Sequence, residues 1–377
     1  NIIFYTCLVL YGKERVFLRR FLTKRRVCIF FFNKIVCAFF RLLPFSFDGR
    51  RKTVAKCGDF YYTYCNKSWR NFTSLLSAAF FVDDYIKYLL CNRFPGKGLT
   101  EVKDIVYDEE HPDTGKLDII YDEKQRGKLT EGKFPVFFMI HGGGWIEGDK
   151  KMRRGYCQHM ARTGAFTVNI SYGLGPKYRF PDYMKQVYKA LQWVVANADK
   201  YGLDLDNFVI SGDSAGGHLS MVTINCQNHP EYREHLGLPD VDIKIKGAIL
   251  NCPAIDFEGK IINLPVIRTM TYHCTGIKHY KKLKSEYEYY NELQVFLGVE
   301  KPFPRLFLNN GIQDVFTNGG SKKLRKALEA KDIPYEYFCA WEPLNSFHDY
   351  NLKMWMPSAR IVLKKEKDFL WRVYQDK

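Results

Sequence analysis

Apolar residues along the chain form short runs that alternate with segments of helical spacing. Continuous apolar runs at residues 135–140 and 165–172 are typical of strands that are buried on both faces of a sheet. Apolar alternation and turn residues predict further strands at 100–107, 117–121, 207–211, 246–252, 305–309 and 335–341.

Helical segments lie between most of these strands. After Pro181, apolar residues recur at helical spacing to about Lys200, and proline suits the first turn of a helix. Further helices are predicted from Ala215, over 318–331 and over about 352–374. Strands that alternate with helices predict the α/β class, with a mostly parallel sheet and helices on both of its faces.

Two segments fall outside this alternation. Residues 60–94 are rich in aromatic side chains and have a helical pattern, and residues 258–301 form an insertion between two predicted strands. Ligands of such sheets bind outside the C-terminal ends of the strands, so both segments are candidates for a cap over that end. Tyrosine and lysine side chains within 278–290 would suit a polar alcohol such as a sugar ester, and a solvated helix face is the alternative.

Charge is unevenly distributed. The chain has 377 residues, with 57 Lys and Arg against 41 Asp and Glu, and a formal net charge of +16. Such a charge favours a nucleic-acid or membrane-surface partner. Residues 1–56 carry 13 basic and 2 acidic residues, which accounts for +11, so the rest of the chain is close to ordinary in charge. Because it has no recognised nucleic-acid-binding motif, we do not expect a nucleic-acid partner.

The first 59 residues are predicted to be a leader or a membrane-associating segment. Basic residues at 13–26 precede an apolar run at 27–40, which is too short to span a bilayer core of about 30 Å as a helix. Three alternatives stay open: an interfacial anchor, a non-functional or poorly ordered leader, and an export signal or true membrane anchor. We expect a cytoplasmic protein, with peripheral membrane contact through residues 1–56 as an added hypothesis.

The 11 cysteines form no CxxC pair, and no Cys/His cluster has the spacing of zinc ligands. They are too sparse for a disulfide scaffold, which favours reduced thiols and a reducing compartment. We expect no metal site.

The most informative motif is Gly-Asp-Ser-Ala-Gly-Gly at residues 212–217. It lies between a predicted strand and a predicted helix, the context of a G-x-S-x-G nucleophile elbow. So sharp a turn strains the backbone of Ser214, requires small neighbours and lifts the hydroxyl clear of the sheet. It also directs N–H groups of the helix start toward a developing oxyanion. By itself, the motif could also be a phosphate-binding turn.

A second glycine-rich motif, His-Gly-Gly-Gly-Trp at 141–145, directly follows the predicted strand 135–140. Three consecutive glycines allow backbone N–H groups to turn into a cavity, as an oxyanion hole requires. Phosphate binding is the alternative, but the sequence has neither G-x-G-x-x-G nor G-x-x-x-x-G-K-[ST].

A nucleophilic serine needs a base, and the base needs an orienting acid. His348 follows the last predicted strand, where a doubly wound hydrolase has its base, and Asp314 follows the preceding one. Helix capping is the alternative role for Asp314. His141 is expected to brace the glycine turn. Asp349 adjoins His348 and cannot easily reach its Nδ1 atom.

Five motifs resemble the hormone-sensitive-lipase-like branch of the α/β hydrolases, a family of esterases and lipases. They are HGGGW at 141–145, SYGLGPKYRFP at 171–181, ANADKYGLDLDNFVISGDSAGG at 196–217, Gly-x-x-Asp at 311–314, and His348. The second differs from the family's Tyr-Arg-Leu-Ala-Pro segment, because Gly173 replaces the arginine and Gly175 the alanine. The resemblance covers about residues 100–350.

This resemblance implies an α/β-hydrolase domain over 60–377, with an eight-stranded type of sheet and a small helical cap at 60–94 and 258–301. It implies an oxyanion hole formed by the N–H groups of Gly143, Gly144 and Ala215, and no metal or organic cofactor.

The implied activity is that of a serine carboxylesterase for short-chain acyl esters such as acetates, with Ser214 as nucleophile, His348 as base and Asp314 as acid. Its expected partner is a small-molecule ester, and the oligomeric state stays open. The alternative activity is that of an aryl formamidase or amidase, because the chain also resembles a sister group that shares the glycine turn. A further alternative is a non-catalytic small-molecule receptor on the same fold. Such receptors lack the base, so the presence of His348 disfavours this alternative.

Overall fold

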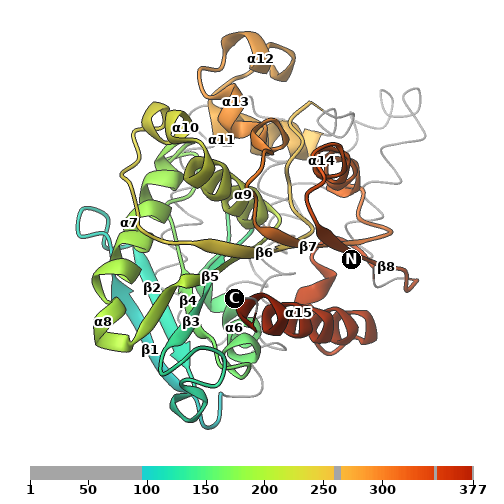
Figure 1. Cartoon of the computed structure of the whole chain (residues 1–377). Helices are drawn as coiled ribbons and strands as arrows, with labels where there is room; N and C mark the ends of the chain where they lie inside the picture. The colour runs from blue at the N-terminus through green and yellow to red at the C-terminus, as the bar shows by residue number, and fades with distance from the viewer. Residues whose placement is uncertain (1–95, 259–264, 344–345, 376–377) are drawn as a thin grey trace, which may run out of the picture. The chain divides into compact units, whose positions relative to one another are not determined.

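The computed structural model describes residues 96–258, 265–343 and 346–375, which are coloured in Figure 1. The leader predicted at 1–59 and the cap segment predicted at 60–94 lie outside these residues, so both stay predictions. None of the described helices combines the length and the apolar composition that a membrane span requires.

The described residues form a sheet with the strand order β1-β2-β4-β3-β5-β6-β7-β8. Strands β3 to β8 run parallel, while β1 and β2 pair antiparallel with each other and β2 pairs antiparallel with β4. The predicted mostly parallel sheet is therefore confirmed. The strands are β1 (Thr100–Val106), β2 (Lys116–Tyr121), β3 (Phe134–Ile140), β4 (Phe166–Ile170), β5 (Leu203–Asp213), β6 (Ile245–Asn251), β7 (Arg305–Gly311) and β8 (Tyr335–Ala340).

Helices cover both faces of this sheet, with α6 and α15 on one face and α9 and α14 on the other (Figure 1). The α-helices are α6 (Arg154–Ala161), α7 (Asp182–Ala196), α8 (Ala198–Tyr201), α9 (Ala215–Asn228), α10 (Pro230–His235), α11 (Pro265–Thr275), α12 (Leu283–Glu286), α13 (Tyr290–Leu293), α14 (Asn318–Ala330) and α15 (Pro357–Gln375). Short 3-10 helices are η1 (Glu123–Gln125), η2 (Lys150–Arg153), η4 (Tyr280–Lys282), η5 (Val295–Gly298) and η6 (Tyr350–Leu352).

The central strand β3 shows why the apolar runs are continuous. All of its residues are buried, and successive side chains of a strand point to opposite faces. Phe137 and Met139 belong to the core that α6 and α15 cover, together with Tyr156 and Leu370. The side chains between them point to the opposite face, where α9 packs.

Several predicted elements differ from the structure. The helix predicted from Pro181 to about Lys200 is interrupted at Asn197, whose side-chain amide donates to the Trp193 carbonyl oxygen (2.8 Å) and so competes with the helical hydrogen bond. The strand predicted at 207–211 extends over 203–213, because Leu203 pairs with Phe134 of β3. Helix α6 was not predicted, since its sequence lacks a clear apolar stripe.

A carboxyl group is buried in the core between α15 and the sheet. Glu366 of α15 is fully buried, and its Oε1 atom accepts a hydrogen bond from Asn309 Nδ2 of β7 (3.1 Å). Burial raises the pKa of Glu366 to about 8, although hydrogen bonds from Tyr156 and Asn309 oppose this rise. The side chain is therefore neutral in the folded protein at pH 7.

This group makes the stability depend on pH. The unfolded chain ionises Glu366 at its ordinary pKa of 4.5, whereas the folded chain keeps the proton to a pH of about 8. The stabilising contribution of the neutral acid is complete below about pH 4.5 and is lost as the pH rises toward 8. We expect the free energy of unfolding of Glu366→Gln, relative to that of the wild type, to increase by about 2–4 kcal/mol between pH 5 and pH 8.

Urea unfolding of both proteins at pH 5, 6.5 and 8 measures this difference. Glu336→Gln is a matched control, because Glu336 is exposed and should leave the pH dependence unchanged. A constant difference between wild type and Glu366→Gln at all three pH values would contradict the prediction.

Candidate active site

Ser214 lies in the sharp turn between the end of β5 and the start of α9. Its backbone has φ 49° and ψ −115°, a conformation that non-glycine residues rarely adopt. The neighbouring glycines make the turn possible. A Cβ atom on Gly212 would lie 2.2 Å from the carbonyl carbon of Gly216, and one on Gly216 would lie 2.0 Å from the Ile140 oxygen. The motif at 212–217 therefore has no room for a side chain at these two positions.

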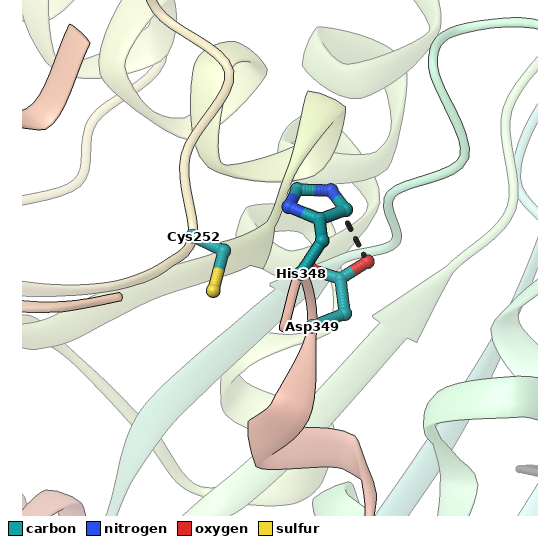
Figure 2. Close-up of side chains that lie close together, drawn as sticks. All are labelled: Cys252, His348 and Asp349. Carbon is teal, nitrogen blue, oxygen red and sulfur yellow. Dashed lines mark ion pairs between the residues drawn. The ribbon is translucent and has the colours of Figure 1, made fainter. Parts of the chain in front are cut away.

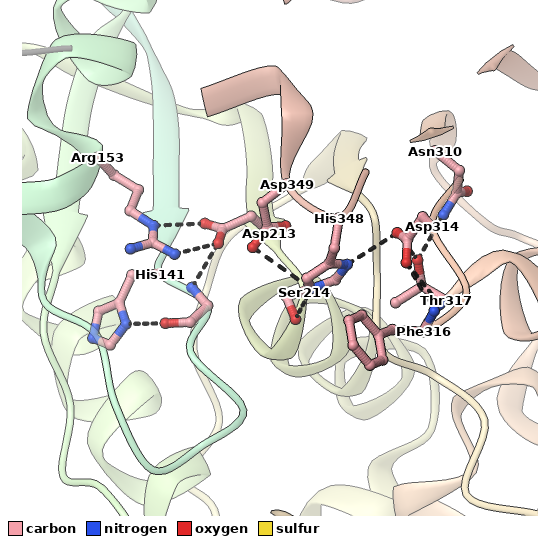
Figure 3. Close-up of polar contacts among 11 residues, drawn as sticks. His141, Arg153, Asp213, Ser214, Asn310, Asp314, Phe316, Thr317, His348 and Asp349 are labelled. Carbon is pink, nitrogen blue, oxygen red and sulfur yellow. Dashed lines mark hydrogen bonds and ion pairs between the residues drawn. The ribbon is translucent and has the colours of Figure 1, made fainter. Parts of the chain in front are cut away.

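The structure brings the three predicted residues together at the C-terminal ends of β5, β7 and β8 (Figure 3). His348 Nε2 lies 2.8 Å from Ser214 Oγ, and His348 Nδ1 lies 2.9 Å from Asp314 Oδ2. An ionised carboxylate can only accept, so the ring proton lies on Nδ1. The lone pair of Nε2 can then accept the serine proton.

Asp314 is held by donors from the loop that follows β7. Its Oδ1 atom accepts from the backbone N–H groups of Phe316 (2.9 Å) and Thr317 (3.2 Å), and its Oδ2 atom accepts from the Thr317 hydroxyl. Burial alone would raise the pKa of Asp314, but His348 and these donors outweigh it and lower that pKa. The carboxylate therefore holds the imidazole and, at the same time, satisfies N–H groups just before α14.

The glycine turn at 141–145 lies against the serine. A Cβ atom on Gly142 would lie 3.0 Å from Ser214 Cβ. Gly143 and Gly144 have φ values of 125° and 60°, which favour glycine. In the described part of the chain, the N–H groups of Gly143, Gly144 and Ala215 have no protein acceptor. Among the described residues, these N–H groups of the turn and of the start of α9 are thus not engaged by a backbone acceptor, as an oxyanion hole requires.

A buried ion pair links this turn to the elbow, and no sequence pattern pointed to it. Arg153 Nε donates to Asp213 Oδ1 (2.9 Å), and Arg153 Nη2 donates to Asp213 Oδ2, which also accepts from the Gly142 N–H group (3.1 Å). Both charged side chains are almost completely buried. Asp213 therefore connects the residue before Ser214 with the first glycine of the turn (Figure 3).

His141 has the bracing position that was expected. Its Nδ1 atom lies 2.8 Å from the Gly142 carbonyl oxygen, and its ring stacks on Tyr172 with centroids 4.4 Å apart. Burial and the charge of Arg153 lower the pKa of His141 to about 4. The ring is therefore neutral at pH 7 and donates to Gly142.

The described part of the insertion at 258–301 contains the helices α11, α12 and α13, and α11 reaches the glycine turn. The sulfur of Met270 lies 2.7 Å from the position that a Cβ atom on Gly144 would take. His218 points from α9 toward this insertion, with Nε2 3.0 Å from the Leu293 oxygen. The sequence had no signal for the contact between Met270 and the turn, because 126 positions separate the two residues.

The tyrosines and lysines of segment 278–290 have mainly structural surroundings. Lys281, Lys282 and Lys284 are exposed. Tyr287 donates its hydroxyl proton to the Phe180 carbonyl oxygen (2.9 Å), and Tyr290 donates to Glu258. These contacts favour a solvated surface with anchored tyrosines over a sugar-binding surface.

Two side-chain groups in the described residues have metal-ligand atoms within 4.8 Å of one another: Cys252, His348 and Asp349, and Asp108, Glu110 and His111. His348 already bonds Ser214 and Asp314, and Asp108 already bonds Lys189 and His111. In both groups, some of the ligand atoms are therefore already engaged in hydrogen bonds within the protein.

A family model described as BD-FAE matches residues 117–261. Probable carboxylic ester hydrolase LipM of Mycobacterium tuberculosis is 35% identical over 127 residues, which are 33% of this chain and 29% of that protein. Arylacetamide deacetylase of Rattus norvegicus is 39% identical over 127 residues, or 31% of this chain and 29% of that protein. The matched region spans less than a third of each relative.

Two solved structures share the fold. Esterase B from Lactobacillus rhamnosis, in an inhibited form, has a TM-score of 0.70 at 22% identity and covers 81% of this chain and 97% of its own. A bacterial heroin esterase has a TM-score of 0.60 at 18% identity, with 78% and 90% covered. The eight-stranded sheet and the likeness to these solved structures show that the described part of the chain has the α/β-hydrolase fold.

Proposed function

We propose that this chain is a serine carboxylesterase that hydrolyses small esters with short acyl chains. The observation that carries the proposal is the hydrogen-bonded series Ser214–His348–Asp314 beside three N–H groups with unused hydrogen bonds. The name of the relative LipM, a probable carboxylic ester hydrolase, supports the same reaction class.

In the first half of the reaction, Ser214 Oγ attacks the ester carbonyl carbon while His348 Nε2 takes the hydroxyl proton. Asp314 stays ionised and stabilises the imidazolium. The carbonyl oxygen becomes an oxyanion that accepts hydrogen bonds from Gly143, Gly144 and Ala215. The imidazolium then gives its proton to the leaving alcohol, which leaves an acyl group on Ser214.

In the second half, His348 takes a proton from a water molecule, and the resulting hydroxide oxygen attacks the acyl carbon. The same N–H groups stabilise the second oxyanion. The bond to Ser214 Oγ then breaks, the proton returns to Oγ, and the carboxylic acid leaves. Each step uses groups of this chain and water.

Rates on matched substrates test the reaction class. We expect 4-nitrophenyl acetate to be hydrolysed at least about 100-fold faster than 4-nitroacetanilide and 4-nitroformanilide, because an aryloxide leaves without needing a proton whereas an anilide needs one. A faster rate on the formanilide would assign the formamidase reaction instead.

The proposed preference for short acyl chains rests on Met270. Its thioether packs on Gly144, so it limits the room beside a carbonyl oxygen bound at the turn. We expect Met270→Ala to raise kcat/KM for 4-nitrophenyl octanoate by about tenfold relative to the acetate, because removing the side chain makes room for methylene groups.

An acyl-length series from acetate to decanoate measures this change. Leu283→Ala is the control, because Leu283 is a buried residue of the same insertion, whereas the three atoms nearest to a Cβ atom on Gly144 all belong to Met270. An unchanged chain-length preference in Met270→Ala would show that another residue limits the acyl chain.

A further inference from the structure

A second carboxylate lies beside the imidazole of His348. The Oδ2 atom of Asp349 is 3.6 Å from His348 Nε2, the nitrogen that faces Ser214 Oγ at 2.8 Å. Figure 2 shows this ion pair with a dashed line. The other nitrogen, Nδ1, faces Asp314 at 2.9 Å. The ring therefore has a carboxylate near each of its nitrogens.

The backbone of Asp349 explains how adjacent residues can make this contact. Asp349 has φ 53° and ψ 34°, the left-handed conformation that aspartate and asparagine tolerate better than most residues. This turn brings the carboxylate back toward the ring of the preceding residue. The carboxylate thereby comes close to Nε2, while Nδ1 is bonded to Asp314.

The surroundings of the ring identify the charges that act on it. Among the described residues, the titratable groups that lie against His348 include Asp314, Asp349 and Cys252. Burial, together with Asp314 and Asp349, raises the pKa of the Cys252 thiol well above its usual range, so this thiol is neutral. Asp213 adjoins Ser214 in the chain, but its charge is paired with Arg153.

Asp349 and Nε2 attract each other only when Nε2 carries a proton. In the neutral ring, Nε2 presents a lone pair, which a carboxylate does not stabilise. In the imidazolium, Nε2 carries a proton and a share of the positive charge, which a carboxylate at this distance does stabilise. Asp349 is buried at 6% exposure, so water screens this attraction weakly.

Building on the proposed esterase function, we propose that Asp349 is a positioning residue that stabilises the imidazolium form of His348 and thereby sets the acid limit of the pH–rate profile. It makes His348 a stronger base toward Ser214. It also keeps His348 protonated, and thus unable to accept the serine proton, up to a higher pH.

The pH dependence of kcat/KM for 4-nitrophenyl acetate tests this proposal. Asp349→Asn keeps the shape and tolerates the left-handed backbone but removes the charge. We expect the acid limb to move down by about one pH unit and the plateau to fall about two- to fivefold, because the base is weaker. Asp332→Asn is the matched control, since Asp332 has φ 49° and a side chain that is 93% exposed.

Asp349→Gly provides a second variant that fits the same backbone and lacks the carboxylate, and it should shift the limb in the same direction. An unmoved acid limb in a folded Asp349 variant overturns the proposal. If neither variant folds, the pH–rate profile of the wild type tests the proposal. An acid limb below about pH 6 would contradict it, because it would show that the charged form of the histidine has no extra stabilisation. A wild type without ester hydrolysis would instead refute the proposed function itself.

Discussion

Ser214→Ala is expected to lower kcat/KM for 4-nitrophenyl acetate by at least about 10⁴-fold, while the protein stays folded. Alanine removes the attacking oxygen, and the residual rate comes from the N–H donors and from binding. The backbone strain is the same for alanine and serine, because both carry a Cβ atom at φ 49°. Stability should therefore change little.

The matched control is Ser220→Ala. Ser220 lies in α9, is fully buried and donates to the Gly216 carbonyl oxygen (2.8 Å), away from the reacting hydroxyl. Its removal should change kcat/KM less than about threefold. A fluorophosphonate probe followed by mass spectrometry of the peptides should label Ser214 in the wild type and in Ser220→Ala. Labelling of a different serine, or full activity of Ser214→Ala, would refute the assignment.

Arg153→Met is expected to reduce the free energy of unfolding by about 3–5 kcal/mol, because it leaves the buried carboxylate of Asp213 without its cation. The ion pair is almost completely excluded from water. Since Asp213 also accepts from Gly142, the glycine turn should shift. We therefore expect kcat for 4-nitrophenyl acetate to fall by about 10²-fold in the protein that stays folded.

The double variant Arg153→Met/Asp213→Asn separates stability from positioning. Because it removes both charges, much of the lost free energy of unfolding should return. The glycine turn still lacks its charged acceptor, so kcat for 4-nitrophenyl acetate should stay low. Arg372→Met is the control for a surface pair, because Arg372 and Glu336 are both about half exposed; it should cost less than about 1 kcal/mol. Equal losses in Arg153→Met and Arg372→Met would contradict the predicted role of burial.

Much of the sheet could be predicted because its signal is local. A strand buried on both faces needs a continuous apolar run, and β3 and β4 have such runs. Helix α6 was missed for the opposite reason. Its buried residues include Gly155 and Gln158, so its sequence shows no stripe that distinguishes it from a loop. The break at Asn197 depends on one side-chain hydrogen bond that competes with the helix.

The candidate site likewise contains residues that the sequence predicts and residues that it does not predict. Ser214, Asp314 and His348 could be predicted because each follows a recognisable strand, and the C-terminal ends of parallel strands meet at one edge of the sheet. The glycines at 212 and 216 are required by contacts within the turn and with the neighbouring strand. Arg153 could not be found, because nothing in its own segment marks the carboxylate that it binds 60 positions later.

The sheet, the serine elbow, the glycine turn and the order of the three predicted site residues could be read from the sequence, because they depend on short-range sterics and on apolar periodicity. Which side chains support them became clear only from the folded structure. The pairing of Arg153 with Asp213, the packing of Met270 on Gly144 and the approach of Asp349 to His348 Nε2 all depend on how loops lie in space. An arginine, a methionine or an aspartate can have many different neighbours in a protein. Its actual partner therefore depends on how the chain packs and cannot be read from the residue type.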